Sequence, residues 1–259
     1  VNYAAGKIAG SNKSDATGVN IPTVSNNISN VAKTDSSLTE DTNLSASGKM
    51  DAEAVATAAL PAMVQLNGTT TVKSSSYFGY GQSYEATSSG TGIIVGKSDT
   101  ELLIVTNAHV VDNIDNLKCV FSDGTSASCS GKGSKSDQDI AVAAVSLSDI
   151  SSDTASNIAI AELEDSSDIK VGQQVVAIGN ALGEGQSVTT GIISAKDRSI
   201  TVNNVTFTGL LMTDAAINSG NSGGALLNSE GKVIAINFAK TSSDGVEGMA
   251  YSIPVSNVK

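Results

Sequence analysis

The chain has 259 residues, enough for one large domain or two modest ones, and a formal net charge of -11. This acidic balance, without any cluster of Lys and Arg, excludes nucleic acid and anionic membrane surfaces as partners, because both need gathered positive charge. Hydrophobic residues make up 40% of the chain, aromatic residues only 3%, and there are 25 glycines. Short strands of Val, Ile, Leu and Ala between glycine turns give this profile, which indicates an all-β protein.

Residues 1–48 are rich in Ser, Asn, Thr, Asp and Gly and have no periodicity, which predicts a polar linker or N-terminal extension. An alternative is that this segment packs on a neighbour or lies in a substrate cleft. The first residue is Val, so we expect that a signal or anchor segment preceded it. No apolar run approaches the roughly 20 residues of a membrane span, so any membrane attachment would use a segment absent from this chain.

A short helix is predicted at Asp51–Leu60, ended by Pro61, which cannot continue a helix without losing a hydrogen bond. The remaining chain is predicted to form strands, most of them separated by Gly, Asp, Asn or Ser turns. The candidates are Ala62–Leu66, Gly92–Val95, Leu102–Thr106, Leu117–Phe121, Ile140–Val145, Gln174–Ile178, Gln186–Ile193, Leu210–Met212, Ala225–Leu227, Val233–Asn237 and Met249–Ile253.

So many strands without amphipathic helices between them indicate antiparallel barrels or sandwiches. The polar stretch Ser146–Asn157 is the natural divide between two halves of similar size. We therefore predict an N-terminal β unit at 49–150 and a C-terminal β unit at 151–259.

Two cysteines, Cys119 and Cys129, flank the hairpin-turn signal Asp123-Gly124. Positions equidistant from the turn can face each other across two strands, close enough for a disulfide. Two free buried thiols are the alternative. A disulfide would place the protein outside the reducing cytosol.

His109 is the sole histidine, so any mechanism that needs an imidazole base near neutral pH must use it. Ser222 lies in the glycine-rich run Asn218-Ser-Gly-Asn-Ser-Gly-Gly224, between two apolar strands. The backbone N–H groups of such a run can converge on a developing oxyanion, and the candidate donors are those of Gly220, Asn221 and Ser222. Taken alone, a lone histidine beside apolar residues is more often a core or surface residue, and composition alone favours a polar surface loop for the glycine-rich run.

A serine nucleophile needs a base, and the base needs an acceptor that holds its tautomer. Asp139 is the best candidate for that acceptor, because it opens an apolar strand that would draw its carboxylate inward. The rivals are Asp112, Asp115 and Asp137, which lack an adjoining apolar strand.

Five sequence blocks in order resemble those of the HtrA (DegP-like) family of trypsin-like serine proteases. Three would be catalytic: Thr106-Asn-Ala-His-Val-Val111, Asp139-Ile-Ala-Val142 and the run from Thr213 to Leu226. The other two are Ala177-Ile-Gly-Asn-Ala-Leu-Gly183 and Thr190-Gly-Ile-Ile-Ser194. The chain order His, Asp, Ser is that of the chymotrypsin-like double barrel.

The resemblance implies two six-stranded antiparallel barrels, with His109 and Asp139 from the first and Ser222 from the second. It implies a serine endopeptidase of protein quality control that cleaves unfolded or misfolded polypeptides through an acyl-enzyme. The pocket for the residue before the scissile bond would be apolar and lined by Ile217 and the segment Asn237, Phe238 and Ala239.

The resemblance also implies a homotrimer and an extracytoplasmic location, either secreted or tethered to the outer face of a bacterial membrane. Family members usually carry one or two PDZ domains after the protease, whereas this chain stops at Lys259, so we expect either that a following segment was removed or that this member lacks the module. A protease-fold chaperone or binding scaffold with a non-productive site is the alternative function. One His and two Cys give no metal-site pattern, no phosphate-binding glycine loop occurs, and we predict no metal and no cofactor.

Overall fold

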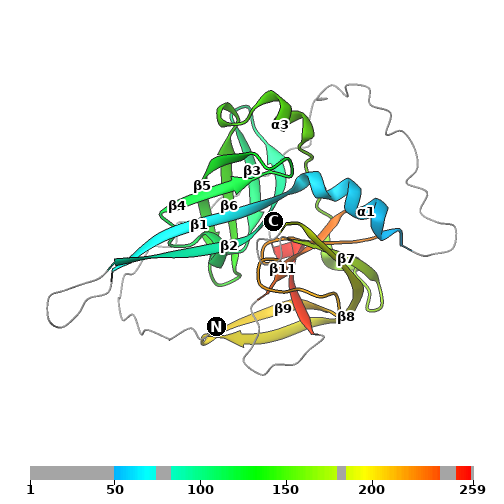
Figure 1. The fold of residues 1–259 in the computed structure, drawn as a ribbon. Coiled ribbons are helices and arrows are strands. Elements are labelled where there is room, and N and C mark those ends of the chain that lie inside the picture. The colour runs from blue at the N-terminus through cyan, green and yellow to red at the C-terminus, as the bar shows by residue number, and fades with distance from the viewer. Residues whose placement is uncertain (1–49, 74–82, 180–184, 240–248, 258–259) are drawn as a thin grey trace, which may run out of the picture.

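Two closed six-stranded β-barrels make up the fold of the computed structural model, which describes residues 50–73, 83–179, 185–239 and 249–257 (Figure 1). The predicted extension at 1–48 lies outside these residues. The first barrel has the order β1-β2-β3-β6-β5-β4. Its strands are β1 (Met63–Lys73), β2 (Ser83–Lys97), β3 (Glu101–Thr106), β4 (Asn116–Val120), β5 (Ser126–Lys135) and β6 (Ile140–Ser146).

The second barrel has the order β10-β11-β12-β9-β8-β7, and all of its neighbouring strands are antiparallel. Its strands are β7 (Gln174–Gly179), β8 (Ser187–Val202), β9 (Val205–Thr213), β10 (Ala225–Leu227), β11 (Val233–Phe238) and β12 (Ala250–Pro254). The predicted all-β class with two six-stranded barrels is thus confirmed.

Each predicted strand overlaps one strand of the structure, and the sequence analysis missed only β5 among the described strands. Strand β5 consists largely of Ser, Gly and Lys, and most of its residues are exposed. It is held by pairing with β4 and β6 rather than by its own apolar side chains. A polar strand of this kind has no hydrophobic alternation for a sequence pattern to detect.

The predicted N-terminal helix is confirmed as α1 (Ala52–Ala59). Asp51 caps it, because its Oδ1 accepts the N–H of Ala54 at 3.1 Å. Pro61 lies in the following 3-10 turn η1 (Leu60–Ala62), where the α-helix has ended. One face of α1 is buried beside β7, so the helix closes one side of the boundary between the barrels (Figure 1).

Each barrel has its own apolar core, and a third cluster joins the two. From the first barrel this joining cluster takes Met63, Ile93, Val105 and Ile140; from the second it takes, among others, Val176, Ile178, Leu227 and Phe238. Burial of this shared surface fixes the barrels against each other, since separating them would expose these side chains to water. The relative position of groups carried by different barrels is therefore defined by packing.

The chain between the barrels forms only short elements. The stretch 146–157, predicted to be the divide, contains η2 (Leu147–Asp149) and α3 (Ser152–Asn157), and η3 (Ser166–Asp168) follows before β7. Among the described residues, none of the helices has the length and apolarity needed to cross a membrane.

The predicted disulfide between Cys119 and Cys129 is not formed, since both cysteines are free. The reason is the hairpin register: Cys119 pairs with Ala127, whereas Cys129 pairs with Leu117, so the two cysteines are displaced by two residues. Burial raises the pKa of the Cys119 thiol far above its usual range, and the neighbouring Cys129 adds to this effect. Burial also raises the pKa of Cys129, to about 11.

Candidate active site

His109 and Asp139 lie in contact at one end of the first barrel. His109 is in the single turn α2 (Ala108–Val111), directly after β3, and Asp139 directly precedes β6. The imidazole Nδ1 lies 2.6 Å from Asp139 Oδ2, and the backbone N–H of His109 donates to Asp139 Oδ1 at 3.0 Å. Both carboxylate oxygens are thus used by one residue, which fixes the orientation of the imidazole ring.

The backbone of Asp139 is held as firmly as its side chain. Its φ of 54° is in the left-handed region, where Asp is more readily accommodated than most residues. Its carbonyl oxygen accepts the N–H of Ala108 at 3.1 Å and the side-chain amide of Asn107 at 3.0 Å. Asn107 is a residue that the sequence analysis missed, and its position two residues before the sole histidine was the available signal.

Two of the three rival aspartates, Asp112 and Asp115, have other partners. Asp112 accepts the hydroxyl of Ser136 at 3.2 Å. Asp115 accepts the N–H of Thr71 and the hydroxyl of Thr70, and these hydrogen bonds lower the pKa of its carboxyl group. Among the described residues, Asp139 is the carboxylate that contacts the imidazole of His109.

Ser222 lies in the loop between β9 and β10, where the backbone donors divide into two groups. The N–H groups of Asn221, Gly223 and Gly224 donate to backbone carbonyls at 3.0 Å each. Within the described part of the chain, no hydrogen-bond partner is found for the N–H groups of Gly220 and Ser222. These two unpaired donors flank residue 221 and are the groups that could bind an oxyanion.

This arrangement corrects the prediction for Asn221. Its N–H donates to the carbonyl of Asn218 at 3.0 Å, so it is already used inside the loop. Its side-chain Oδ1 accepts the hydroxyl of Ser187 at 3.2 Å. Asn221 therefore shapes the loop and does not offer an oxyanion donor.

The Ser222 loop packs directly against the start of α2. A Cβ placed on Gly223 would lie 2.2 Å from Thr106 Oγ1 and 3.1 Å from the backbone nitrogen of Asn107. With its φ of 81°, position 223 requires glycine for both its space and its backbone. The absence of a side chain here lets the second barrel bring Ser222 close to the element that carries His109.

The hydroxyl of Ser222 accepts the N–H of Ala239 at 3.3 Å. Among the described residues no hydrogen bond joins this hydroxyl to His109, although the two residues lie on packed elements. A catalytic hydrogen bond is often long in the free enzyme and tightens when substrate binds. The structure thus brings His109 and Asp139 into direct contact and presents Ser222 from the neighbouring barrel.

The predicted pocket residues separate into two pairs. Ile217 and Ala239 belong to one apolar cluster of the second barrel. The side chain of Asn237 is buried and donates to the carbonyls of Ile178 and Ala225. The prediction that the Asn237 side chain lines the pocket is therefore wrong, because its amide is used to join β11 to β7 and β10.

Phe238 was also predicted to line the pocket, and this prediction is wrong for its side chain as well. The ring is only 1% exposed and packs on Phe207, with ring centroids 5.0 Å apart. The imidazole of His109 also lies near the Phe238 ring, with ring centroids 6.4 Å and ring planes 89° apart. Phe238 thus supports the histidine from inside the barrel interface.

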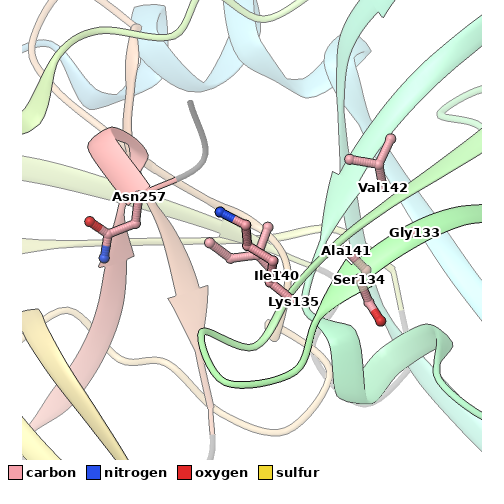
Figure 2. A pocket seen from close by; sticks show the side chains of 7 residues that line it. All are labelled: Gly133, Ser134, Lys135, Ile140, Ala141, Val142 and Asn257. Carbon is pink, nitrogen blue, oxygen red and sulfur yellow. The ribbon is translucent and has the colours of Figure 1, made fainter. Parts of the chain in front are cut away.

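A separate hollow opens beside the strand that follows Asp139. Figure 2 shows it between the β5–β6 hairpin and the C-terminal turn η5 (Val255–Asn257), with Ile140, Val142, Lys135 and Asn257 among its lining residues. Neither His109 nor Ser222 lines it. This hollow is therefore distinct from the site built around those two residues.

Two antiparallel six-stranded barrels with His and Asp on the first and Ser on the second define the trypsin-like class of proteins. The trypsin-like peptidase domain family matches residues 90–236. The serine protease Do-like HtrA of Bacillus subtilis is 38% identical over 208 residues, which cover 77% of this chain and 45% of that protein. The periplasmic serine endoprotease DegP of Escherichia coli is 38% identical over 182 residues, 70% of this chain and 36% of DegP.

Solved structures agree with these relatives. The HtrA-type protease AlgW with a decapeptide has a TM-score of 0.63 and 31% identity, covering 80% of this chain and 64% of AlgW. AlgW with a tripeptide gives a TM-score of 0.62 at 32% identity, covering 80% of this chain and 60% of AlgW. The chain belongs to the HtrA family of trypsin-like serine proteases. It spans less than half the length of the two curated relatives.

Proposed function

We propose that this chain is a serine endopeptidase with His109, Asp139 and Ser222 as its catalytic triad. The observation that carries the proposal is the 2.6 Å contact between Asp139 Oδ2 and His109 Nδ1. The turn that carries His109 packs against the Ser222 loop, in which the N–H groups of Gly220 and Ser222 have no hydrogen-bond partner among the described residues. A buried carboxylate on Nδ1 leaves Nε2 as the basic nitrogen. Membership of the HtrA family supports the same activity.

The reaction would proceed in two stages, acylation of Ser222 and hydrolysis of the acyl-enzyme. His109 takes the proton of the Ser222 hydroxyl as the oxygen attacks the scissile carbonyl, and the N–H groups of Gly220 and Ser222 stabilise the oxyanion. His109 then protonates the leaving amine, and an acyl-enzyme remains on Ser222. Water, activated by His109, releases the acyl group. Asp139 keeps its negative charge and stabilises the imidazolium throughout.

We propose that the substrates are unfolded or misfolded polypeptides, with a small aliphatic residue before the scissile bond. The apolar neighbourhood of Ile217 and Ala239 supports that preference. Complexes of AlgW with a tripeptide and with a decapeptide support a polypeptide substrate. Cleavage of unfolded chains would serve protein quality control.

The proposal extends to assembly and location. Relatives named as periplasmic proteases support an extracytoplasmic location, either secreted or tethered to the outer face of a membrane. We propose a homotrimer, which light scattering of the purified protein would test.

In the same proposal, residues 1–48 are a polar extension, and 49–150 and 151–259 are the two β units. A non-productive binding scaffold is less well supported, because the two oxyanion donors are unpaired within the described residues.

Hydrolysis of fluorescently labelled, unfolded casein tests the proposal, with the wild type compared with Ser222→Ala. The matched control is Ser219→Ala, which removes an exposed hydroxyl from the same loop. We expect the control to retain wild-type activity and Ser222→Ala to lose it by several orders of magnitude. Equal activity of Ser222→Ala and the wild type would refute the proposed function.

A further inference from the structure

Thr91, at the middle of β2, connects the first barrel to the Ser222 loop through both its backbone and its side chain. Its N–H donates to the carbonyl of Ser222 at 2.8 Å, and its hydroxyl donates to the carbonyl of Gly220 at 2.8 Å. The residue is 1% exposed. Its own carbonyl accepts the hydroxyl of Thr106 at 2.6 Å, in the strand that leads to His109.

These hydrogen bonds fix two of the three consecutive peptide units around Ser222. The unit joining residues 220 and 221 is held at its carbonyl by the Thr91 hydroxyl and at its N–H by the carbonyl of Asn218. The unit joining 222 and 223 is held at its carbonyl by the Thr91 N–H and at its N–H by the carbonyl of Asn237. The unit between them, which joins residues 221 and 222, is held at its carbonyl by the N–H of Gly224 at 3.0 Å.

The peptide unit held by the Thr91 hydroxyl, which joins residues 220 and 221, lies between the two unpaired donors. The N–H of Ser222 belongs to the central unit, and the N–H of Gly220 belongs to the unit just before the one held by the Thr91 hydroxyl. Gly220 has a φ of 98°, a conformation from which a glycine rotates easily. Without the hydroxyl, the 220–221 unit would lose the bond that keeps its carbonyl directed into the first barrel.

We infer that Thr91 is a positioning residue for the oxyanion hole, acting through its hydroxyl on the Gly220 carbonyl. The inference rests on the proposed function and names a residue outside the triad and its donors. Thr91 does not touch the substrate. It sets the direction of the two N–H groups that do, and it links their geometry to the packing of the two barrels.

Thr91→Val tests the inference, because it removes the hydroxyl while it keeps the side-chain shape and the backbone N–H. Thr91→Ser restores a hydroxyl, and Thr154→Val is the matched control, since Thr154 is 2% exposed and its hydroxyl bonds to the hydroxyls of Thr125 and Ser151, neither of which belongs to the Ser222 loop. Loss of a whole oxyanion donor costs about 10²–10³ in kcat. A misdirected donor should cost less, and we expect Thr91→Val to lower kcat about 10-fold or more with KM nearly unchanged.

A peptide boronate, whose tetrahedral adduct occupies the oxyanion hole, should bind Thr91→Val more weakly by a similar factor. Thr91→Ser and Thr154→Val should keep wild-type kcat and boronate affinity. Wild-type kcat and boronate binding in folded Thr91→Val would overturn the inference, as would an equal kcat loss in Thr154→Val. If Thr91→Val does not fold, Thr91→Ala is measured against the same expectations.

Ser222→Ala separates this inference from the proposed function. If wild type and Ser222→Ala cleave casein equally, the function itself is refuted. If Ser222→Ala is inactive while Thr91→Val retains full kcat, only the role of Thr91 is refuted. Amide chemical shifts of Gly220 and Ser222 give a readout apart from activity: they should move in Thr91→Val and stay in Thr154→Val.

Discussion

Replacing Asp139 with Asn should abolish most activity while it preserves the fold. Asn fits the left-handed backbone at this position, and its side-chain oxygen can still accept the His109 N–H. Its amide, however, would then place a donor against His109 Nδ1, where the carboxylate now lies 2.6 Å away. The amide donor would hold the imidazole in the tautomer that carries its proton on Nε2, the nitrogen that must face Ser222. Because Nε2 is already protonated, His109 could no longer take the serine proton.

The expected loss in kcat is about 10⁴-fold, which corresponds to about 5.4 kcal/mol of transition-state stabilisation. Initial rates of casein hydrolysis at neutral pH measure it, and urea unfolding checks that stability is kept. Asp112→Asn is the control, because the Asp112 carboxylate accepts the Ser136 hydroxyl and, among the described residues, has no hydrogen bond to His109. If Asp139→Asn keeps more than a tenth of the wild-type kcat, the assigned role of Asp139 is incorrect.

Three further outcomes are expected. Gly223→Ala should lower the free energy of unfolding by about 2 kcal/mol or more and abolish casein cleavage, because the new Cβ would overlap Thr106 Oγ1 and the Thr91 carbonyl; unchanged urea unfolding would contradict this. Phe238→Ala should cost about 3–5 kcal/mol in the same measurement, since its ring fills the barrel interface. Cys129, with its pKa raised to about 11, should react slowly with iodoacetamide at pH 7.5 and faster as the pH rises, as followed by intact-protein mass spectrometry. Rapid alkylation of the folded protein at pH 7.5 would disprove that expectation.

The sequence predicted those parts of the fold that depend on local pattern. Apolar runs such as Val233–Asn237 identified strands, and Asp51 with Pro61 marked the limits of helix α1. Strand β5 escaped prediction because its polar residues are held by neighbouring strands rather than by apolar alternation. The hairpin register, which separates Cys119 from Cys129, depends on the pairing of whole strands and could not be obtained from distance to a turn.

In the candidate site, too, residues marked by a local sequence pattern could be predicted, whereas those defined by contacts between distant segments could not. His109 and Ser222 could be proposed from the sequence as candidates, because the chain has a single histidine and few serines in a glycine-rich run. The partners that hold them, Thr91 and Asn107, were not predicted, since their roles arise from contacts between segments far apart in the sequence. For the same reason Asn237 and Phe238 were assigned to a pocket although their side chains face the interior.

In the proposed mechanism the hydroxyl of Ser222 becomes a nucleophile through His109 and Asp139. Reaction of the native protein with a fluorophosphonate, followed by peptide mass spectrometry, tests it most directly, because only an activated serine displaces the fluoride at a useful rate. We expect one phosphonyl adduct, on the peptide containing Ser222, and none in His109→Ala. An unmodified Ser222, or an adduct that forms equally well in His109→Ala, would contradict it.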